Sequence, residues 1–167
     1  YDVMIIGYFR LNRYNFIKEL EANNPGIRVG YYLYHSKWGF IFHKTFRSKY
    51  SHVKYEDLKY KQLSFEDVVD LYGQSSAIID VPQKGQRGLT IRSLEALAMH
   101  KKLITTNENI KLYDFYNPDD VYVLLGANAV LPKKEWYNRP YSIKDRVIEE
   151  YSIGRWLEKL LGYDNGK

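Results

Sequence analysis

The sequence predicts an α/β domain in which helices flank an open parallel sheet. Short continuous apolar runs, typical of strands buried on both faces, alternate along the chain with segments of helical hydrophobic spacing. The chain has 167 residues, of which 45% are hydrophobic and 27% charged, and this matches one globular domain. We therefore expect residues 1–167 to form a single domain of Rossmann-like type.

The first third of the chain predicts a βαβ unit followed by an irregular segment. A strand is expected at 2–7, a helix over 11–20 and a second strand at 27–34. An Asn-Asn-Pro-Gly sequence separates that helix from the second strand. Residues 35–63 lose the periodicity, so we expect a loop or short helix there, then a weak strand at 53–59.

The rest of the chain continues the alternation. The expected strands are 77–81, 102–106 and 121–125. The expected helices are 64–73, capped by Ser64, and 91–99, capped by Thr90, with Ile91, Leu94, Leu97 and Ala98 lining one face. Residues 136–141 are expected to be irregular, and a last helical region is expected from Ser142.

Composition excludes several classes of protein. The sequence has no apolar run of about 18 residues and no signal-peptide pattern, which disfavours membrane spanning and secretion. It has no cysteine, which excludes disulfides and thiolate metal sites and fits a reducing compartment, so we expect a cytoplasmic protein. The net charge of +5 favours an anionic partner. Because the first residue is Tyr1, we expect a piece of a longer protein.

Two predicted strand-to-helix loops are suited to phosphate. In the first, Gly7 lets the backbone turn closely, and Arg10 and Arg13 supply guanidinium groups that can bind phosphate oxygens bidentately. The second loop, 84–90, brings glycines and cations, Lys84 among them, to a helix amino terminus, which attracts anions. Neither loop matches a specific phosphate-binding motif, and a purely structural role stays open for both.

Two charged residues of the predicted helix 91–99 add to this pattern. Glu95 lies near the helix start, where a carboxylate can accept hydrogen bonds from the ribose hydroxyls of a nucleotide; the alternative is a solvent-facing side chain. Arg92 lies in the first turn, where the helix dipole disfavours a cation. A compensating anion is therefore expected beside Arg92, and the alternative is a pairing of Arg92 with an Asp or Glu on the surface.

These residues resemble a known family. The sequence Gly-Leu-Thr-Ile-Arg-Ser-Leu-Glu-Ala-Leu-Ala at 88–98, followed by Lys-Lys-Leu-Ile-Thr-Thr-Asn at 101–107, is similar to the donor-site signature of GT-B glycosyltransferases. The similarity is greatest to the spore-maturation CgeB-like group and to related lipopolysaccharide or capsule biosynthesis enzymes. Residues 63–81 resemble the helix and strand that precede this signature in the family. The likeness extends from Val3 to about Val123.

The resemblance implies the C-terminal half of a GT-B fold, which binds a nucleoside-diphosphate sugar. It implies that Glu95 binds the ribose and that Tyr60, Gln62 and Leu63 lie beside the base. The residues implied for the donor diphosphate are Gly7, Arg10, Arg13, Arg87, Gly88, Thr90 and Arg92. The chain departs from the family pattern at His100, where many relatives have glycine, and in the 84–88 loop, which lacks the acidic residue that many members use to bind the sugar.

The resemblance also implies partners and a reaction. The acceptor would be a saccharide or lipid-linked molecule of cell-surface polysaccharide synthesis, and the acceptor-activating base would come from the protein's own N-terminal GT-B domain. The fragment alone is then expected to bind donor without turnover. Cations and a helix terminus can stabilise a departing diphosphate, so we expect no cofactor and no essential metal. Asp119 and Asp120 are expected to cap a turn before a strand.

The basic and aromatic stretch 31–61 admits other functions. Aromatic rings can stack on bases while lysines and arginines neutralise phosphates, although no RNA-binding signature is present and nucleic acid is disfavoured. The same stretch could give a peripheral contact with the inner membrane face. The four histidines are too scattered to predict a metal site or a catalytic triad. A non-enzymatic Rossmann-like interaction module is the remaining alternative.

Overall fold

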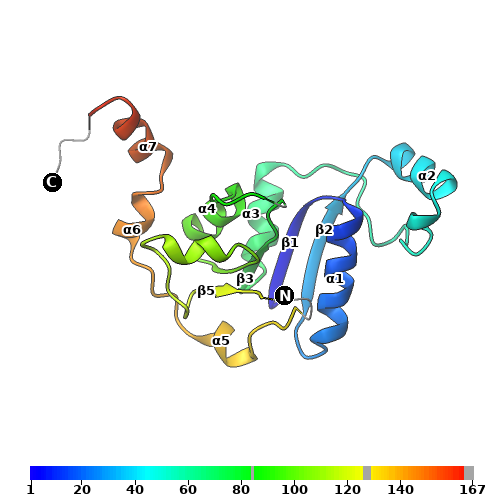
Figure 1. The fold of residues 1–167 in the computed structure, drawn as a ribbon, viewed down its shortest axis with the longest axis horizontal. Helices are drawn as coiled ribbons and strands as arrows, with labels where there is room; N and C mark the ends of the chain where they lie inside the picture. Colours follow the sequence, from blue (N-terminus) through cyan, green and yellow to red (C-terminus); the bar gives the residue numbers. More distant parts are fainter. Residues whose placement is uncertain (84, 126–128, 164–167) are drawn as a thin grey trace.

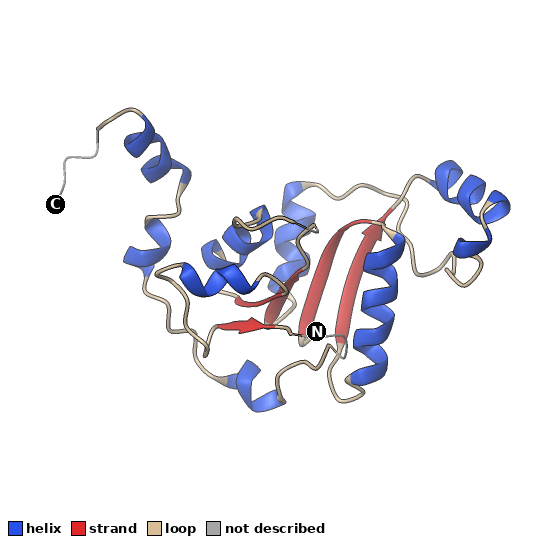
Figure 2. Cartoon of the chain, in the orientation of Figure 1, coloured by secondary structure: helices blue, strands red, loops and turns tan. Residues whose placement is uncertain are grey.

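The structure is a computed structural model and describes residues 1–83, 85–125 and 129–163. In this part of the chain, parallel strands form one open sheet in the order β2-β1-β3-β4-β5, with helices on both faces (Figures 1 and 2). The predicted Rossmann-like α/β fold is confirmed. The strands are β1 (Val3–Tyr8), β2 (Val29–Tyr34), β3 (Ala77–Asp80), β4 (Lys102–Thr105) and β5 (Val121–Val123).

The helices of the described residues follow the predicted order, with one addition. A short helix at Lys134–Asn138 overlaps the first part of the stretch 136–141 that was expected to be irregular, and its Trp136 and Tyr137 are buried, while 139–141 are not helical. No helix in this part of the chain is long and apolar enough to cross a membrane. The helices are α1 (Leu11–Asn23), α2 (Lys37–Phe46), α3 (Phe65–Gly73), α4 (Ile91–Ala98), α5 (Lys134–Asn138), α6 (Asp145–Glu149) and α7 (Ile153–Leu160), with 3₁₀ turns at Ser48–Tyr50 and Glu108–Leu112.

Alternate residues of β1 face two separate hydrophobic layers. Val3 and Ile5 pack in the layer that α1 and α5 cover, whereas Met4 and Ile6 pack in the layer that α3, α4 and α6 cover. All four side chains are buried. This double burial explains why the strand is a continuous apolar run in the sequence and not an alternating one.

The predicted helix caps are confirmed, and burial of α4 is only partly on the apolar residues that the sequence places on one face. Ser64 and Asp67 form a capping box at the start of α3, and Thr90 accepts a hydrogen bond from the Ser93 amide at the start of α4. Ile91 and Ala98 are exposed, and the fully buried side chains of α4 are those of Ser93, Ala96 and Leu97. Hydrogen bonds to a buried carboxylate, described below, turn the Ser93 face of the helix toward the sheet.

The chain leaves α4 through His100, whose φ of 50° lies in the left-handed region. Glycine adopts this conformation without cost, and histidine is one of the other residues that tolerate it. Its Nε2 lies 2.8 Å from the Asp145 carboxylate, at the start of α6. The residue therefore both ends the helix and contacts the C-terminal segment.

The expected strand at 53–59 is wrong. This segment makes only one parallel bridge with β2, between Lys59 and Tyr34, so β2 remains the edge of the sheet among the described residues. The preceding residues turn because Asp57 accepts hydrogen bonds from the hydroxyls of Tyr14 (2.6 Å) and Tyr31 (2.9 Å). These bonds hold the backbone away from a ladder alongside β2.

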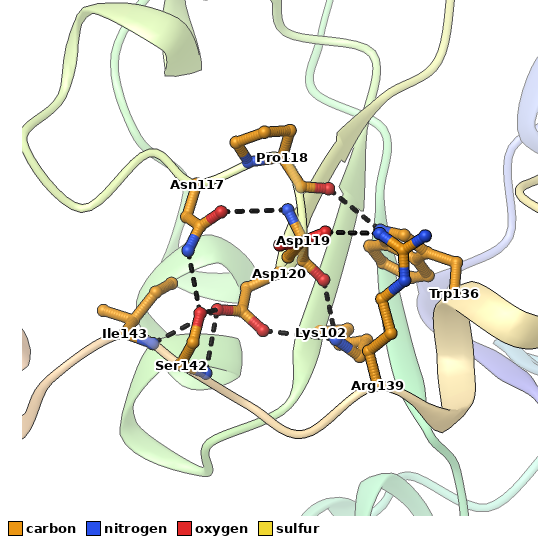
Figure 3. A network of polar contacts seen from close by, with 9 residues as sticks. All are labelled: Lys102, Asn117, Pro118, Asp119, Asp120, Trp136, Arg139, Ser142 and Ile143. Atoms are coloured by element: carbon orange, nitrogen blue, oxygen red, sulfur yellow. Dashed lines mark hydrogen bonds and ion pairs between the residues drawn. The ribbon is translucent and has the colours of Figure 1, made fainter.

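A buried ion pair at the amino edge of the sheet contacts the C-terminal segment at residues 142–143 (Figure 3). Lys102, at the start of β4, lies 3.2 Å from the Asp120 carboxylate and 5.0 Å from the centre of the Trp136 ring. Asp120 also accepts hydrogen bonds from the amides of Ser142 and Ile143. The expected turn-capping role of Asp120 is therefore wrong: the side chain of Asn117 caps that turn.

Candidate functional site

The candidate site lies at the carboxyl edge of the sheet, between β1 and β3. β2 lies on one side of β1 and the later strands lie on the other, and α1 and α4 cover opposite faces. Tyr8 closes β1 and Asp80 closes β3 at this point. Open α/β sheets bind ligands in the crevice where the strand order reverses in this way.

Two guanidinium groups meet over Gly7. A Cβ atom at this position would lie 2.7 Å from Nη2 of Arg92 and 3.0 Å from Nη1 of Arg13, so a side chain here would displace the ends of these two arginines. Arg13 donates a hydrogen bond to the carbonyl of Tyr8 (2.6 Å), and Nε of Arg92 donates one to the carbonyl of Ile6 (2.9 Å). Both cations are thus fixed on the backbone at the end of β1.

The electrostatics of this group favour an anionic ligand. Burial lowers the pKa of Arg13, and the charges of Arg92 and Arg10 lower it further. Both effects disfavour the charged form of Arg13, whereas a neighbouring anion would favour it. A phosphate placed between these guanidinium groups would supply that charge and accept hydrogen bonds from both sides.

Asp80 links the cations to the start of α4. One carboxylate oxygen accepts hydrogen bonds from the hydroxyls of Thr90 (2.6 Å) and Ser93 (3.1 Å), and the other lies 3.9 Å from Arg92. Burial raises the pKa of Asp80, against the opposing effects of these hydroxyls and of Arg92. The anion expected beside Arg92 is therefore present in the protein itself, and the first-turn arginine does not by itself require a ligand.

An aromatic pocket adjoins the cationic group. The walls come from the ends of β1 and β2, from residues 62–63 and from α3 and α4. Tyr8 and Tyr34 meet edge to face, with ring centres 5.6 Å apart, and the Tyr8 side chain is largely exposed. Rings that line an open pocket in this way offer stacking surfaces to a flat ligand. The pocket lining includes Tyr8, Tyr32, Tyr34, Gln62, Leu63 and Glu95.

Glu95 lies in the wall of this pocket beside Arg92. The side chain is half-buried, and burial raises its pKa, with Arg92 opposing the rise and Asp80 adding to it. Glu95 thus lines an open pocket, and its carboxylate has no hydrogen-bond donor among the residues that the structure describes.

The pocket continues into a polar hollow. Tyr8, Ile91 and Arg92 line both, and Arg10, Arg13 and Thr90 line only the polar part. The combined surface thus has an aromatic end with a carboxylate and a cationic end at the start of α4. A ligand with a flat apolar group and a polyanionic group fits this distribution.

The structure brings together most of the residues predicted from the sequence, but not all of them. Gly7, Gln62, Leu63, Arg92 and Glu95 share the aromatic pocket, and Arg10, Arg13 and Thr90 share the polar hollow. Three others lie outside both walls: Tyr60, which packs in the α1 layer, and the exposed residues Arg87 and Gly88, whose carbonyls accept hydrogen bonds from Asn107. Lys84 lies outside the described residues.

Several residues of the site were missed in the sequence. Tyr32 and Tyr34 alternate along β2, and this spacing could have placed both on one face. Asp80 ends an apolar strand, where a carboxylate is unusual enough to attract notice. No group of three or more histidine, aspartate or glutamate side chains in the described ranges is arranged to hold a metal ion.

Comparison with known proteins found no match to this chain among family models, curated proteins or solved structures. The assignment of a function therefore rests on the residues of the site and on the sequence resemblance given above.

Proposed function

We propose that this domain binds the donor of a glycosyltransferase, a nucleoside-diphosphate sugar. One observation carries the proposal: the guanidinium groups over Gly7 adjoin an aromatic pocket that contains Glu95, at the point where the strand order reverses. A nucleoside diphosphate has the matching parts in the matching order, a flat base, a ribose diol and a polyanion. The resemblance to GT-B enzymes supplies the reaction class.

The proposal gives each part of the donor a place. The base lies against the tyrosines of the aromatic pocket and beside Gln62 and Leu63. The ribose hydroxyls donate to the Glu95 carboxylate. The diphosphate lies between Arg13 and Arg92, at the start of α4, where helix amides and the helix dipole add to the positive charge.

This placement suits the chemistry of glycosyl transfer. The bond between the anomeric carbon and a diphosphate oxygen breaks, and negative charge develops on the leaving diphosphate while the sugar becomes oxocarbenium-like. Fixed guanidinium groups stabilise that charge without reorganising. The proposal assigns this task to Arg13 and Arg92, so donor binding is expected to be independent of Mg²⁺.

The proposal assigns acceptor binding and activation to a part of the enzyme outside this domain. Under the proposal, an N-terminal GT-B domain supplies the base that activates the acceptor, a saccharide or lipid-linked molecule of cell-surface polysaccharide synthesis. The enzyme then works on the cytoplasmic side of the membrane. The 167-residue chain by itself binds donor and does not turn over.

Calorimetric titration with nucleotides tests the proposal. The chain is titrated with UDP, GDP, ADP, CMP and their sugar conjugates, with and without Mg²⁺. We expect selective binding of one nucleoside diphosphate, and a loss of about 1 to 3 kcal/mol in Glu95→Ala, since the carboxylate accepts hydrogen bonds from the ribose. Glu135→Ala, at an exposed glutamate in α5, is the control and should bind normally. Absence of binding to every nucleotide would favour a non-enzymatic interaction module.

A further inference from the structure

The segment between β2 and α3 carries the whole net charge of the protein. Residues 35–61 contain seven lysines or arginines and two carboxylates, a net charge of +5, while the rest of the chain has 18 residues of each sign. All of these cations except Lys44 are exposed. Lys44 is instead held by the carbonyls of Ser51 and Val53. The segment is thus a localised cationic surface on an otherwise balanced protein.

The same segment exposes a row of aromatic side chains on α2. Trp38, Phe42 and Phe46 follow each other at intervals of four residues and lie on one face of the helix. They are 81%, 55% and 72% exposed. The rings of Phe42 and Phe46 are 5.0 Å apart. Single exposed aromatics are ordinary, but three in a row on one helix form an apolar ridge.

The opposite face of α2 is fixed to the protein. Phe40 is fully buried and packs against Phe9 and Tyr55, at ring distances of 5.9 and 5.0 Å. Ser36 caps the helix by accepting a hydrogen bond from the Gly39 amide. The aromatic ridge is therefore held outward by a folded helix, and its exposure does not result from fraying.

We propose that α2 docks this protein on an anionic lipid surface. The ridge would enter the interface between headgroups and acyl chains, with α2 lying in the plane of the membrane. Lys37 and Arg47, at the two ends of the helix, and Lys49 would contact the headgroups. Membrane attachment needs both an apolar and an electrostatic contribution to be stable, and α2 with its flanks offers both.

The shape of the surface favours lipid over nucleic acid. Phe42 and Phe46 pack against each other and lie in one row with Trp38, and a continuous apolar strip of this kind suits burial at the boundary between headgroups and acyl chains. Figure 1 shows α2 at one end of the molecule, beyond the carboxyl end of β2 and away from α3 and α4. A projecting helix at that end can touch a plane without obstruction from the rest of the domain.

Docking through α2 would have a consequence for the site. The helix follows β2 at the carboxyl edge of the sheet, the same edge that carries Gly7 and Arg92. A membrane bound at α2 therefore lies on the side of the molecule to which the candidate site opens. Lipid binding itself does not depend on the nucleotide proposal, and the two are measured separately.

Vesicle co-sedimentation tests the lipid contact. The chain is mixed with vesicles of phosphatidylcholine alone or of phosphatidylcholine with phosphatidylglycerol. We expect binding to the anionic vesicles, weakened by salt, and a loss of at least about tenfold in the partition coefficient of Trp38→Ser, since an aromatic ring leaves the interface. A charge variant, Lys37→Glu with Arg47→Glu, should lose binding to a similar degree. Both changes are at exposed positions, and thermal melts check that the variants fold.

A matched control comes from α7, which also exposes a tryptophan. Trp156 is 58% exposed, and Trp156→Ser should bind vesicles as the unchanged protein does. Tryptophan emission should shift to shorter wavelength on anionic vesicles in Trp156→Phe and not in Trp38→Phe. Absence of vesicle binding, or loss of binding in Trp156→Ser alone, would overturn the proposal. Salt-dependent binding of a single-stranded oligonucleotide through Trp38, without vesicle binding, would overturn it in favour of nucleic acid.

Discussion

The substitution Arg13→Met tests whether Arg13 binds a ligand or stabilises the fold. Arg13 is partly buried, and its guanidinium lies beside that of Arg92 over Gly7. Among the residues that the structure describes, its guanidinium donates one hydrogen bond, to the carbonyl of Tyr8 at 2.6 Å. Methionine keeps much of the apolar stem and removes the charge.

The expected change in stability is small. The variant loses the hydrogen bond to Tyr8, and it gains relief from the burial of a charge and from repulsion by Arg92 and Arg10. The lost hydrogen bond and the relieved burial and repulsion of the charge oppose each other, so we expect the free energy of unfolding to change by no more than about 1 kcal/mol. Urea denaturation measures this change.

The expected change in affinity is large. A hydrogen bond between a charged donor and an anion contributes about 1.5 to 3 kcal/mol, so the Kd for a nucleoside diphosphate should rise about 10- to 150-fold. Arg28→Met is the control, because Arg28 is an exposed arginine at the amino edge of the sheet and pairs there with Asp2. A stability loss above about 2 kcal/mol with unchanged affinity would show that Arg13 is structural. An equal loss of affinity in Arg28→Met would show that binding follows net charge alone.

Three further outcomes are expected from the same contacts. Burial raises the pKa of the Glu95 carboxyl, so protons compete with the ribose and nucleotide affinity should fall as pH drops through that raised pKa. In Glu95→Gln only the pH dependence that comes from protonation of the nucleotide phosphate should remain. Equal pH profiles of the two proteins in calorimetry would refute this role of Glu95. Lys102→Met leaves the Asp120 carboxylate buried without its cation and should cost about 3 to 5 kcal/mol in urea denaturation; a loss below about 1 kcal/mol would contradict the assigned role of this ion pair. Thr90→Val removes the cap of α4 and a hydrogen bond to Asp80, and should lower the unfolding free energy by about 1 to 2 kcal/mol; an unchanged melting temperature would show that the cap contributes little.

The local chemistry of the sequence was sufficient to predict most of the elements. Strands buried on both faces leave continuous apolar runs, and Ser64 and Thr90 mark helix starts because their side chains satisfy nearby backbone amides. The Gly7 loop and the α4 start were also recognisable, because each combines a glycine with cations at the end of a predicted strand.

The failures come from contacts between distant parts of the chain. The segment 53–59 has the composition of a weak strand, but Asp57 is drawn to the hydroxyls of Tyr14 and Tyr31 instead. Similarly, Asp120 was assigned to a local turn because its partner Lys102 lies in another strand. Hydrogen-bond partners that the fold brings together have no periodic signal in the sequence.

The candidate site contains residues that the sequence could predict and contacts that it could not. Arg13 and Arg92 were each recognised as phosphate ligands, but their meeting over Gly7 depends on the packing of α1 and α4 on opposite faces of the sheet. Asp80 was missed because its role exists only once Thr90 and Ser93 fold over it. The resemblance singled out several residues that line these pockets, and the topology determines which of them lie together.

The most direct test of the donor-site account is backbone amide chemical-shift mapping during titration with UDP, GDP or ADP. The account predicts that the nucleotide that binds most tightly produces its largest shifts at Gly7, Tyr8, Leu63 and residues 91–95. Arg28 and the amino edge of the sheet should remain unchanged. Largest shifts within residues 35–61, or small shifts spread over the surface with each nucleotide, would contradict the account.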